Sequence, residues 1–221
     1  MTSSLPAAIF FDHDGTLVDT EPLWAQSKSD LAVQFGKTWT EEDTLACLGR
    51  PMTDTLIRLQ ELGIPLSKPE LLARLTTDAR EIISQTEVPF LPGISDLLEE
   101  LAQARIPTAI VTNATAEIAN MTAGRAPEGL IRTVIGNEDV TDPKPNPQPY
   151  LMAAQRLGVE PEDSVAVEDS PSGVASAMAA GMKTIVVPGM QPVGPDQGSI
   201  HLNHEDLTLE ALRGLFAPRP A

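Results

Sequence analysis

A short apolar run that ends in two acidic residues constrains the fold of this chain more than any other feature. Residues 7–11 are uninterruptedly apolar, which predicts a buried strand. Asp12 and Asp14 follow it, and the two-residue period of a strand predicts that both carboxylates point to one side and His13 to the other. Gly15 then permits a tight turn. We therefore expect two carboxylates close together at the carboxyl end of this strand.

Two negative charges at this range repel each other unless a cation or a shared proton lies between them. Carboxylate oxygens favour a hard cation, Mg²⁺ before Zn²⁺. Taken alone, an Asp-x-Asp-Gly string is equally compatible with an acidic turn after an edge strand. The choice between a cation site and a plain turn depends on what the rest of the chain places beside these acids.

From residue 94 onward the chain alternates between helical and strand patterns. Helices are predicted at 94–104, 116–123, 147–157, 172–180 and 207–215, and strands at 108–112, 133–135, 164–167 and 184–187. This alternation predicts an α/β fold, a doubly wound parallel sheet with helices on both faces. Ligand-binding groups of such sheets collect beyond the carboxyl ends of the strands. Polar residues follow three predicted strands at that edge: Asp12 and Asp14, Thr112 and Asn113, and Glu168 and Asp169.

The segment between the first strand and this alternating part is almost wholly helical. Helices are predicted at 53–62 and 69–85, and Thr40 with Asp43 is typical of a helix N-terminal cap. We therefore expect two domains, an α/β core and a helical insert. Their expected bounds are residues 1–18 with 89–221 for the core and residues 19–88 for the insert.

Composition narrows the classes of partner. Of 221 residues, 31 are Asp or Glu and 15 are Lys or Arg, giving a formal charge of −16. This acidity weighs against nucleic acid, which is bound through basic side chains, and an anionic substrate would need a local basic group. The single cysteine, Cys47, excludes an intrachain disulfide and fits a reducing compartment. Seeing no signal peptide and no membrane-spanning run, we expect a cytoplasmic monomer that binds neither membrane nor nucleic acid.

The string Asp-His-Asp-Gly-Thr after an apolar strand resembles motif I of the haloacid dehalogenase (HAD) superfamily. In that superfamily the first Asp is a nucleophile that accepts a phosphoryl group, and the second is an acid/base that protonates the leaving oxygen and later activates water. The resemblance therefore implies that Asp12 is the nucleophile and Asp14 the acid/base. Dehalogenases and phosphonatases of the superfamily lack the second acid, so Asp14 implies phosphate ester substrates.

Two further strings resemble motifs II and III. Residues 110–113 match motif II, which implies that Thr112, with Asn113 beside it, binds the transferred phosphoryl group through neutral hydrogen-bond donors. Residues 142–150 match motif III of one subfamily, where Lys-Pro-x-Pro precedes an aromatic residue. The prolines stiffen the segment, so Lys144 is expected to be fixed beside the carboxylates, where it offsets their repulsion and contacts phosphoryl oxygens.

Residues 165–170 resemble motif IV, whose acids hold Mg²⁺. The ligands that the resemblance implies are Asp12, Asp169 and the backbone carbonyl of Asp14. Adjacent residues on an extended chain diverge, so we expect Asp169 as the direct ligand and Glu168 close behind it, reaching the ion through water.

The position of the helical insert, directly after motif I, marks the superfamily members with a subclass I cap. The strings Glu21-Pro22-Leu23-Trp24 and Leu91-Pro92-Gly93, with Lys-Pro-x-Pro-x-x-Tyr and Glu-Asp-Ser, resemble the β-phosphoglucomutase-like branch. Within it the chain is most similar to bacterial hexitol phosphatases and 2-deoxyglucose-6-phosphate phosphatases. The resemblance covers almost the whole chain and implies a HAD-like Rossmannoid core with a helical cap domain.

Some departures from this branch bear on function. The mutase has a histidine past motif I, where this chain has Trp24. In its cap loop the mutase has an arginine that binds the second phosphate of the sugar, and this chain has Met52 there. Both departures favour hydrolysis over return of the phosphoryl group. Arg50 is the only cation of the cap loop, so we expect Arg50 and Trp24 to contact the substrate. Residues 122–129 also depart from the usual Gly-Leu-x-x-x-Phe pattern.

These features together predict a Mg²⁺-dependent phosphatase that hydrolyses small phosphorylated metabolites, sugar or polyol phosphates, through an aspartyl phosphate. One alternative is a sugar phosphomutase of the β-phosphoglucomutase type. Another is a non-enzymatic phospho-acceptor, because receiver domains also combine clustered acids, a threonine, a lysine and an aspartyl phosphate. The helical insert and Asp14 count against a receiver domain.

Overall fold

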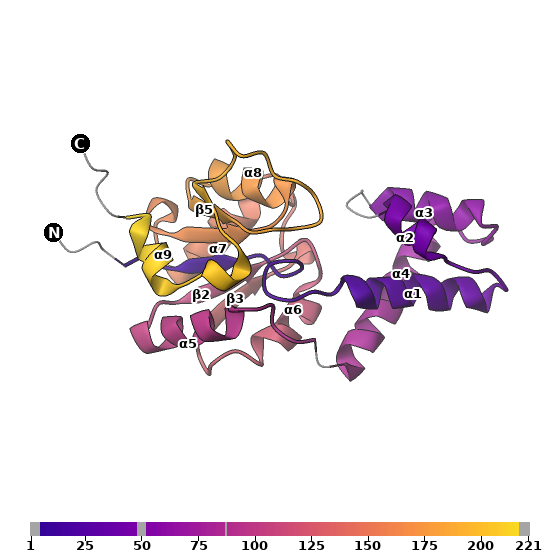
Figure 1. Cartoon of the computed structure of the whole chain (residues 1–221), viewed down its shortest axis with the longest axis horizontal. Coiled ribbons are helices and arrows are strands. Elements are labelled where there is room, and N and C mark those ends of the chain that lie inside the picture. Colours follow the sequence, from indigo (N-terminus) through magenta and orange to yellow (C-terminus); the bar gives the residue numbers. More distant parts are fainter. Residues whose placement is uncertain (1–4, 48–51, 87, 217–221) are drawn as a thin grey trace. The chain divides into compact units, whose positions relative to one another are not determined.

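The chain folds into two compact units. The computed structural model describes residues 5–47, 52–86 and 88–216. One unit, here the core unit, comprises Met1–Asp19 and Pro89–Ala221, and the other, here the cap unit, comprises Thr20–Val88 (Figure 1). Across the described ranges every helix is too short or too polar to traverse a bilayer.

The core unit is built on a six-stranded parallel sheet in the order β3-β2-β1-β4-β5-β6. The strands are β1 (Ile9–Phe11), β2 (Thr108–Val111), β3 (Ile131–Ile135), β4 (Val165–Glu168), β5 (Lys183–Val186) and β6 (Ile200–His201). This order confirms the predicted doubly wound α/β fold. Strand β6 is not predicted from the sequence, because two residues are too few to show a period and they follow a segment that resembles a loop.

Helices cover both faces of the sheet, which is why the central strands are mostly apolar and fully buried. On one face α7 and α8 pack against small side chains of the sheet, with the rings of Phe10 and Tyr150 edge to face at 6.4 Å. The other face carries α5, α6 and α9 (Figure 1). The bounds of these helices are α5 Ile94–Ala104, α6 Ala116–Ala123, α7 Gln148–Leu157, α8 Pro171–Ala179 and α9 Leu209–Gly214.

Single turns of 3-10 helix complete the core unit at Asn137–Asp139 (η1), Pro161–Asp163 (η2) and His204–Asp206 (η3). The N-terminus of α8 is capped by a side chain. The helix begins after Ser170, whose hydroxyl oxygen accepts a hydrogen bond from the backbone N–H of Gly173 at 3.1 Å. Ser170 is therefore the N-cap of this helix, and Pro171 takes the first helical position, where its missing N–H leaves no hydrogen bond unmade.

The cap unit consists of α1 (Glu21–Gln34), α2 (Glu41–Cys47), α3 (Met52–Glu61) and α4 (Lys68–Gln85). Its hydrophobic core lies between α1, α3 and α4, where Leu31, Leu59, Leu71 and Leu75 are fully buried. The helix pattern predicted from the sequence is confirmed here, with α3 and α4 each beginning one residue earlier than expected.

The start of α2 shows the predicted cap. The Asp43 carboxylate accepts hydrogen bonds from the Thr40 backbone N–H at 2.8 Å and from the Thr40 hydroxyl at 2.7 Å, and the Asp43 N–H donates to that hydroxyl at 3.2 Å. The Nε of Arg58 in α3 donates to the same carboxylate at 2.6 Å. Asp43 thus caps one helix and ties it to the next.

Asp43→Ala should lower the free energy of unfolding of the cap unit by about 1–3 kcal/mol, because it removes the cap and leaves the Arg58 guanidinium without this partner. Denaturant unfolding followed by tryptophan fluorescence measures the change, since both tryptophans of the chain, Trp24 and Trp39, lie in this unit. The exposed neighbour Glu42 provides the control, and Glu42→Ala should change the value by less than about 0.5 kcal/mol. Equal effects of both substitutions would contradict this account of the cap.

Candidate active site

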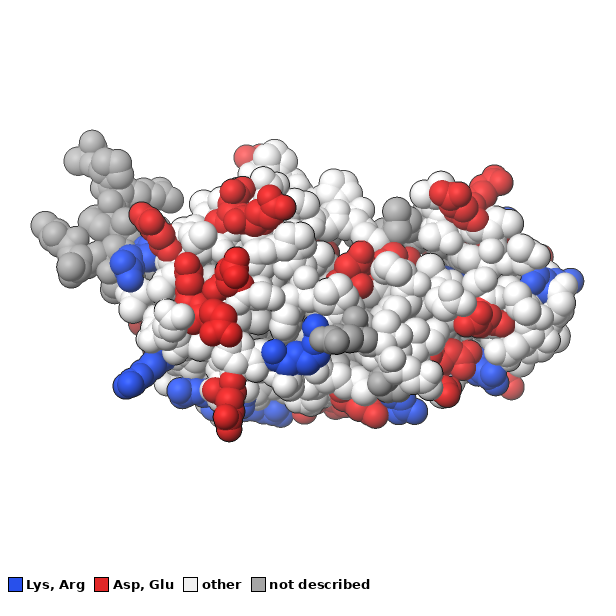
Figure 2. All heavy atoms as spheres, turned by 60° about the horizontal axis from the view of Figure 1, so that its bottom comes forward, with Lys and Arg blue, Asp and Glu red and all other residues white. Residues whose placement is uncertain are grey.

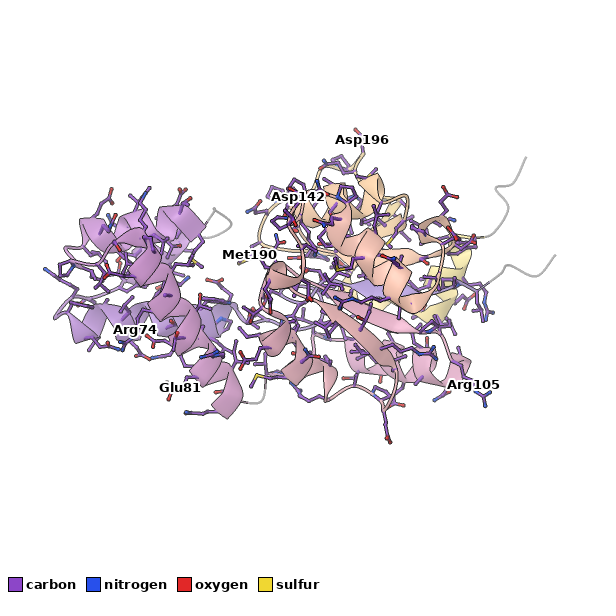
Figure 3. The ribbon with its side chains drawn as sticks, turned by 180° about the vertical axis from the view of Figure 1, so that it is seen from behind. Arg74, Glu81, Arg105, Asp142, Met190 and Asp196 are labelled. Atoms are coloured by element: carbon purple, nitrogen blue, oxygen red, sulfur yellow. The ribbon has the colours of Figure 1, made fainter. Side chains whose placement is uncertain are left out.

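Polar residues lie at or directly after the carboxyl ends of three adjacent strands, β2, β1 and β4, at one edge of the sheet. Strand order reverses direction between β1 and β4, and ligands of doubly wound sheets bind beyond the carboxyl ends at such a point. The loops after β3 and β5 lie at the same end of the core unit, as Asp142 and Met190 show in Figure 3, whereas Arg105, which precedes β2, lies at the opposite end. The sheet topology therefore gathers the acidic and polar residues of the motifs.

Three buried carboxylates meet at this edge. Asp12, Glu168 and Asp169 each offer an oxygen that lies within 4.8 Å of the others. The backbone fixes Asp12, because its N–H donates to the carbonyl of Val167 in the neighbouring strand at 3.0 Å. Side chains of Asp12 and Asp169 keep only slight exposure, and that of Glu168 has none.

One ammonium group lies against this cluster. Nζ of Lys144 donates to Asp12 Oδ1 at 2.7 Å, to Glu168 Oε1 at 2.6 Å and to the carbonyl oxygen of Val111 at 2.7 Å. All three of its protons therefore have protein acceptors, drawn from the ends of β1, β4 and β2. The structure places Lys144 beside carboxylates, as the sequence predicted, although its second partner is Glu168 and not Asp14.

Tyr150, the only tyrosine of the chain, is fully buried and donates its hydroxyl to Glu168 Oε1 at 2.5 Å. Its ring also lies beneath the Lys144 ammonium, with Nζ 5.2 Å from the ring centroid. Sequence reasoning noted an aromatic residue at this position and assigned it no contact. The tyrosine hydroxyl could have indicated this contact, because a buried Tyr O–H needs a hydrogen-bond acceptor.

The close approach of these charges shifts their pKa values. Burial alone would lower the pKa of Lys144, but attraction by Asp12 and Glu168 outweighs it and raises the pKa to about 12. Burial, and then repulsion by Asp12, raises the pKa of Glu168 from 4.5 to about 7, although Lys144 and Tyr150 oppose the rise. Burial, Asp12 and Glu168 together raise the pKa of Asp169 from 3.8 to about 8.

The acid cluster fits a divalent cation. Its three carboxylates face a single ammonium, and oxygen-only donors suit a hard ion. The site is also shaped around Asp169: a Cβ added at Gly15 or Gly189 would collide with its carboxylate, and Thr16 Oγ1 donates to it at 3.4 Å. Gly15 has a φ of +79°, which glycine adopts without strain. Asp12 and Asp169 would hold such a cation, with Glu168 beside them.

The expected divergence of Glu168 and Asp169 is corrected by the structure. Strand β4 ends at Glu168, so Asp169 lies in the following turn and its carboxylate returns toward that of Glu168. Both oxygens of Glu168 already have donors, Lys144 and Tyr150 on Oε1 and the hydroxyl of Ser170 on Oε2 at 3.4 Å.

The predicted alternation of Asp12, His13 and Asp14 is also wrong in part. Strand β1 ends at Phe11, so its two-residue period does not continue through the acids. Asp14 does not share the described acid cluster, and its Oδ2 lies 3.4 Å from Nδ1 of His13. His13 is buried, and its Nε2 is 2.7 Å from the hydroxyl of Thr122 in α6.

The remaining predicted site residues fall into two groups. Thr112 and Asn113 follow β2 at the edge of the sheet that holds the acid cluster. Thr112 is buried, and its hydroxyl oxygen accepts a hydrogen bond from the Ala114 N–H at 3.0 Å, whereas Asn113 is exposed. In the cap unit, Trp24 is half-buried and packs against the hydrophobic core, and Arg50 lies outside the described residues. Substrate contacts of all four residues stay predictions.

On the face that Figure 2 shows, acidic side chains lie over both units, with basic side chains among them. A formal charge of −16 repels anions at long range. An anionic substrate would therefore depend on attraction inside the site, from Lys144 and from a bound cation.

Comparison with known proteins identifies the family. The sequence profile of haloacid dehalogenase-like hydrolases matches residues 9–187. The chain belongs to this family. Hexitol phosphatase A of Escherichia coli (strain K12) is 35% identical over 205 residues, 91% of this chain and 89% of the relative. A phosphorylated carbohydrates phosphatase of Thermotoga maritima is 32% identical over 80% of this chain and 83% of its own length.

The fold comparison agrees with the sequence comparison. A crystal structure from Thermotoga maritima, described as a candidate β-phosphoglucomutase, superposes with a TM-score of 0.78 at 29% identity and covers 94% of this chain and 98% of its own. The predicted superfamily, the β-phosphoglucomutase-like branch and the phosphatase class of enzyme are confirmed by these matches.

A divalent cation should stabilise this hydrolase more at high pH than at low pH. The pKa values of Asp169 and Glu168 are raised in the cation-free fold, so the stability that these groups contribute is complete below about pH 4 and is lost as the pH rises through about 7 to 8. Cation binding requires ionised carboxylates and opposes that loss. Calorimetry with and without MgCl₂ should therefore show a larger rise in Tm at about pH 8 than at about pH 6. Asp169→Asn should abolish most of the rise, and a pH-independent rise would contradict the assignment of these acids.

Proposed function

We propose that this hydrolase is a Mg²⁺-dependent phosphatase of small phosphorylated metabolites, sugar or polyol phosphates, that works through an aspartyl phosphate on Asp12. The observation that carries the proposal is the buried ammonium of Lys144 on Asp12 Oδ1, beside Glu168 and Asp169. A carboxylate held in this way is fixed in direction and close to groups that attract phosphoryl oxygens.

In the first step a carboxylate oxygen of Asp12 forms a bond to phosphorus as the ester P–O bond breaks, and Asp14 gives a proton to the leaving oxygen. Lys144 holds Asp12 in place, and Thr112 and Asn113 offer neutral donors to the phosphoryl oxygens. Bound at Asp12, Asp169 and the Asp14 carbonyl, Mg²⁺ would supply charge neutralisation for the phosphoryl group.

In the second step a water molecule attacks the phosphorus of the aspartyl phosphate, and Asp14, now ionised, takes its proton. The bond between phosphorus and Asp12 breaks, inorganic phosphate leaves, and both acids return to their starting states. The side chain of Asp14 is 37% exposed, so both a leaving oxygen and an attacking water molecule could approach it.

The substrate class rests on relatives and on the cap. The names of two relatives specify hexitol and carbohydrate phosphates, which supports sugar or polyol phosphates here. We assign residues 19–88 to a cap domain that selects the leaving group through Arg50 and Trp24. Trp24 replaces the histidine of a mutase, and Met52 replaces the arginine that binds the second phosphate of the sugar. The phosphoryl group is therefore passed to water and not back to a sugar.

Purified protein should release inorganic phosphate from sugar or polyol phosphates with Mg²⁺ and lose this activity in EDTA, while Ca²⁺ should restore it poorly. Asp12→Asn should lower kcat by about 10³-fold or more, because an amide is a poor nucleophile. Asp142→Asn, at an exposed acid of the same edge, is the control and should retain activity. Phosphorus NMR distinguishes free phosphate from an isomerised sugar phosphate. Formation of the isomerised sugar phosphate would identify a mutase. Turnover in EDTA would contradict the metal assignment.

Asp14→Asn should slow alkyl phosphates more than p-nitrophenyl phosphate. An alkoxide leaving group needs a proton as the ester bond breaks, whereas p-nitrophenolate leaves without one. We expect a loss of about 10² to 10⁴ in kcat for the alkyl ester and a smaller loss for the aryl ester. Equal losses on the two esters would remove Asp14 from the acid/base role.

A further inference from the structure

The buried imidazole of His13 has one ring nitrogen without a hydrogen-bond partner. The side chain is 1% exposed, Nε2 lies 2.7 Å from Thr122 Oγ1, and Nδ1 makes no hydrogen bond in the described part of the chain. An unpaired buried polar atom is destabilising, so such atoms are rare in native proteins and call for an explanation.

The unpaired nitrogen faces the acid/base. Nδ1 lies 3.4 Å from Asp14 Oδ2, slightly beyond the usual range of a hydrogen bond. Catalytic hydrogen bonds are often long before substrate binds and shorten in the reacting complex. A small rotation of the partly exposed Asp14 side chain would close this gap.

Both attachments of the imidazole are fixed. The His13 carbonyl accepts hydrogen bonds from the N–H groups of Leu17 at 2.9 Å and Val18 at 3.2 Å, which closes the turn after β1. Thr122 is buried at 5% exposure in α6 on the far side of the ring. The imidazole is therefore held at two points, through its backbone carbonyl and through Nε2.

The hydrogen-bond partners define the arrangement of protons on a neutral ring. If the Thr122 hydroxyl donates to Nε2, the remaining ring proton is on Nδ1 and points toward the Asp14 carboxylate. Thr122 would then set the tautomer, in the way that outer partners of catalytic and metal-binding histidines fix ring orientation. Thr122 also begins the stretch 122–129 in which this chain departs from its branch.

We propose that His13 is a positioning residue that, oriented by Thr122, donates a hydrogen bond from Nδ1 to the carboxylate of Asp14 and holds it in line with the leaving oxygen. This inference rests on the acid/base role of Asp14 under the proposed function. His13 does not touch the substrate in this account. Its loss would leave attack by Asp12 intact and impair the proton transfer that Asp14 performs.

The side-chain amide of Asn falls near Nδ1 of a histidine and that of Gln near Nε2, so the two substitutions separate the nitrogens. His13→Asn should keep kcat for an alkyl phosphate within about threefold, because a donor still faces Asp14. His13→Gln and His13→Leu should lower it by about 10- to 100-fold, the range for lost outer-shell partners. For p-nitrophenyl phosphate, whose leaving group needs no proton, all three should stay within about threefold.

Thr122→Val supplies a milder variant that leaves the imidazole in place. It should show the same preference for the aryl ester, with a smaller loss on the alkyl ester. Thr184→Val is its control, since Thr184 is an equally buried threonine in β5 whose hydroxyl donates to the Met182 carbonyl at 3.3 Å. Thermal unfolding of every variant, compared with its kcat ratio between the two esters, separates lost stability from lost positioning.

Equal losses on both esters, or equal activity of His13→Asn and His13→Gln, would overturn the positioning role while Asp14→Asn still discriminates between the esters. If Asp14→Asn itself fails to discriminate, the acid/base role of Asp14 is wrong, and the role of His13 is overturned with it. Loss of activity in Asp12→Asn remains the separate test of the proposed function.

Discussion

The ion pairs of Lys144 are the interaction on which the rest of the site depends. Its ammonium joins the ends of three strands through Asp12, Glu168 and the Val111 carbonyl, at distances of 2.6 to 2.7 Å. Buried carboxylates at this density would repel one another without it, and removing one partner of a buried charge cluster is strongly destabilising. The cluster keeps an excess of negative charge even so, which makes it a site for a cation.

Much of this arrangement could be predicted from the sequence. The apolar runs gave the sheet, and the parallel topology required Asp12, Thr112 and Asp169 to meet at one edge. The approach of Glu168 to Asp169 and the position of Asp14 could not be predicted, because both depend on where a strand ends by one or two residues. The hydrogen bond from Tyr150 to Glu168 depends on the packing of α7 against the sheet, a tertiary arrangement that no local pattern encodes.

Under the proposed function, the chemistry and the choice of substrate are divided between the two units. The core unit supplies the nucleophile, the ammonium and the acid cluster, none of which depends on the leaving group. The acid/base Asp14 stands slightly apart, next to His13 and in the turn that leads toward the cap unit. Such a division would leave phosphoryl transfer unchanged while the leaving group varies, because the segment that we propose to select the leaving group is a different part of the chain.

Under the proposed function Asp12 carries the phosphoryl group during turnover, and chemical trapping of the aspartyl phosphate tests this directly. Enzyme mixed with Mg²⁺ and a sugar phosphate is quenched in acid during turnover and treated with borohydride, which reduces an acyl phosphate to an alcohol and so converts phosphorylated aspartate to homoserine. Peptide mass spectrometry should then find homoserine at position 12 and at no other aspartate, and Asp12→Asn should remove the signal. Homoserine at position 14 or 169, or none at any position while phosphate is released, would contradict the account.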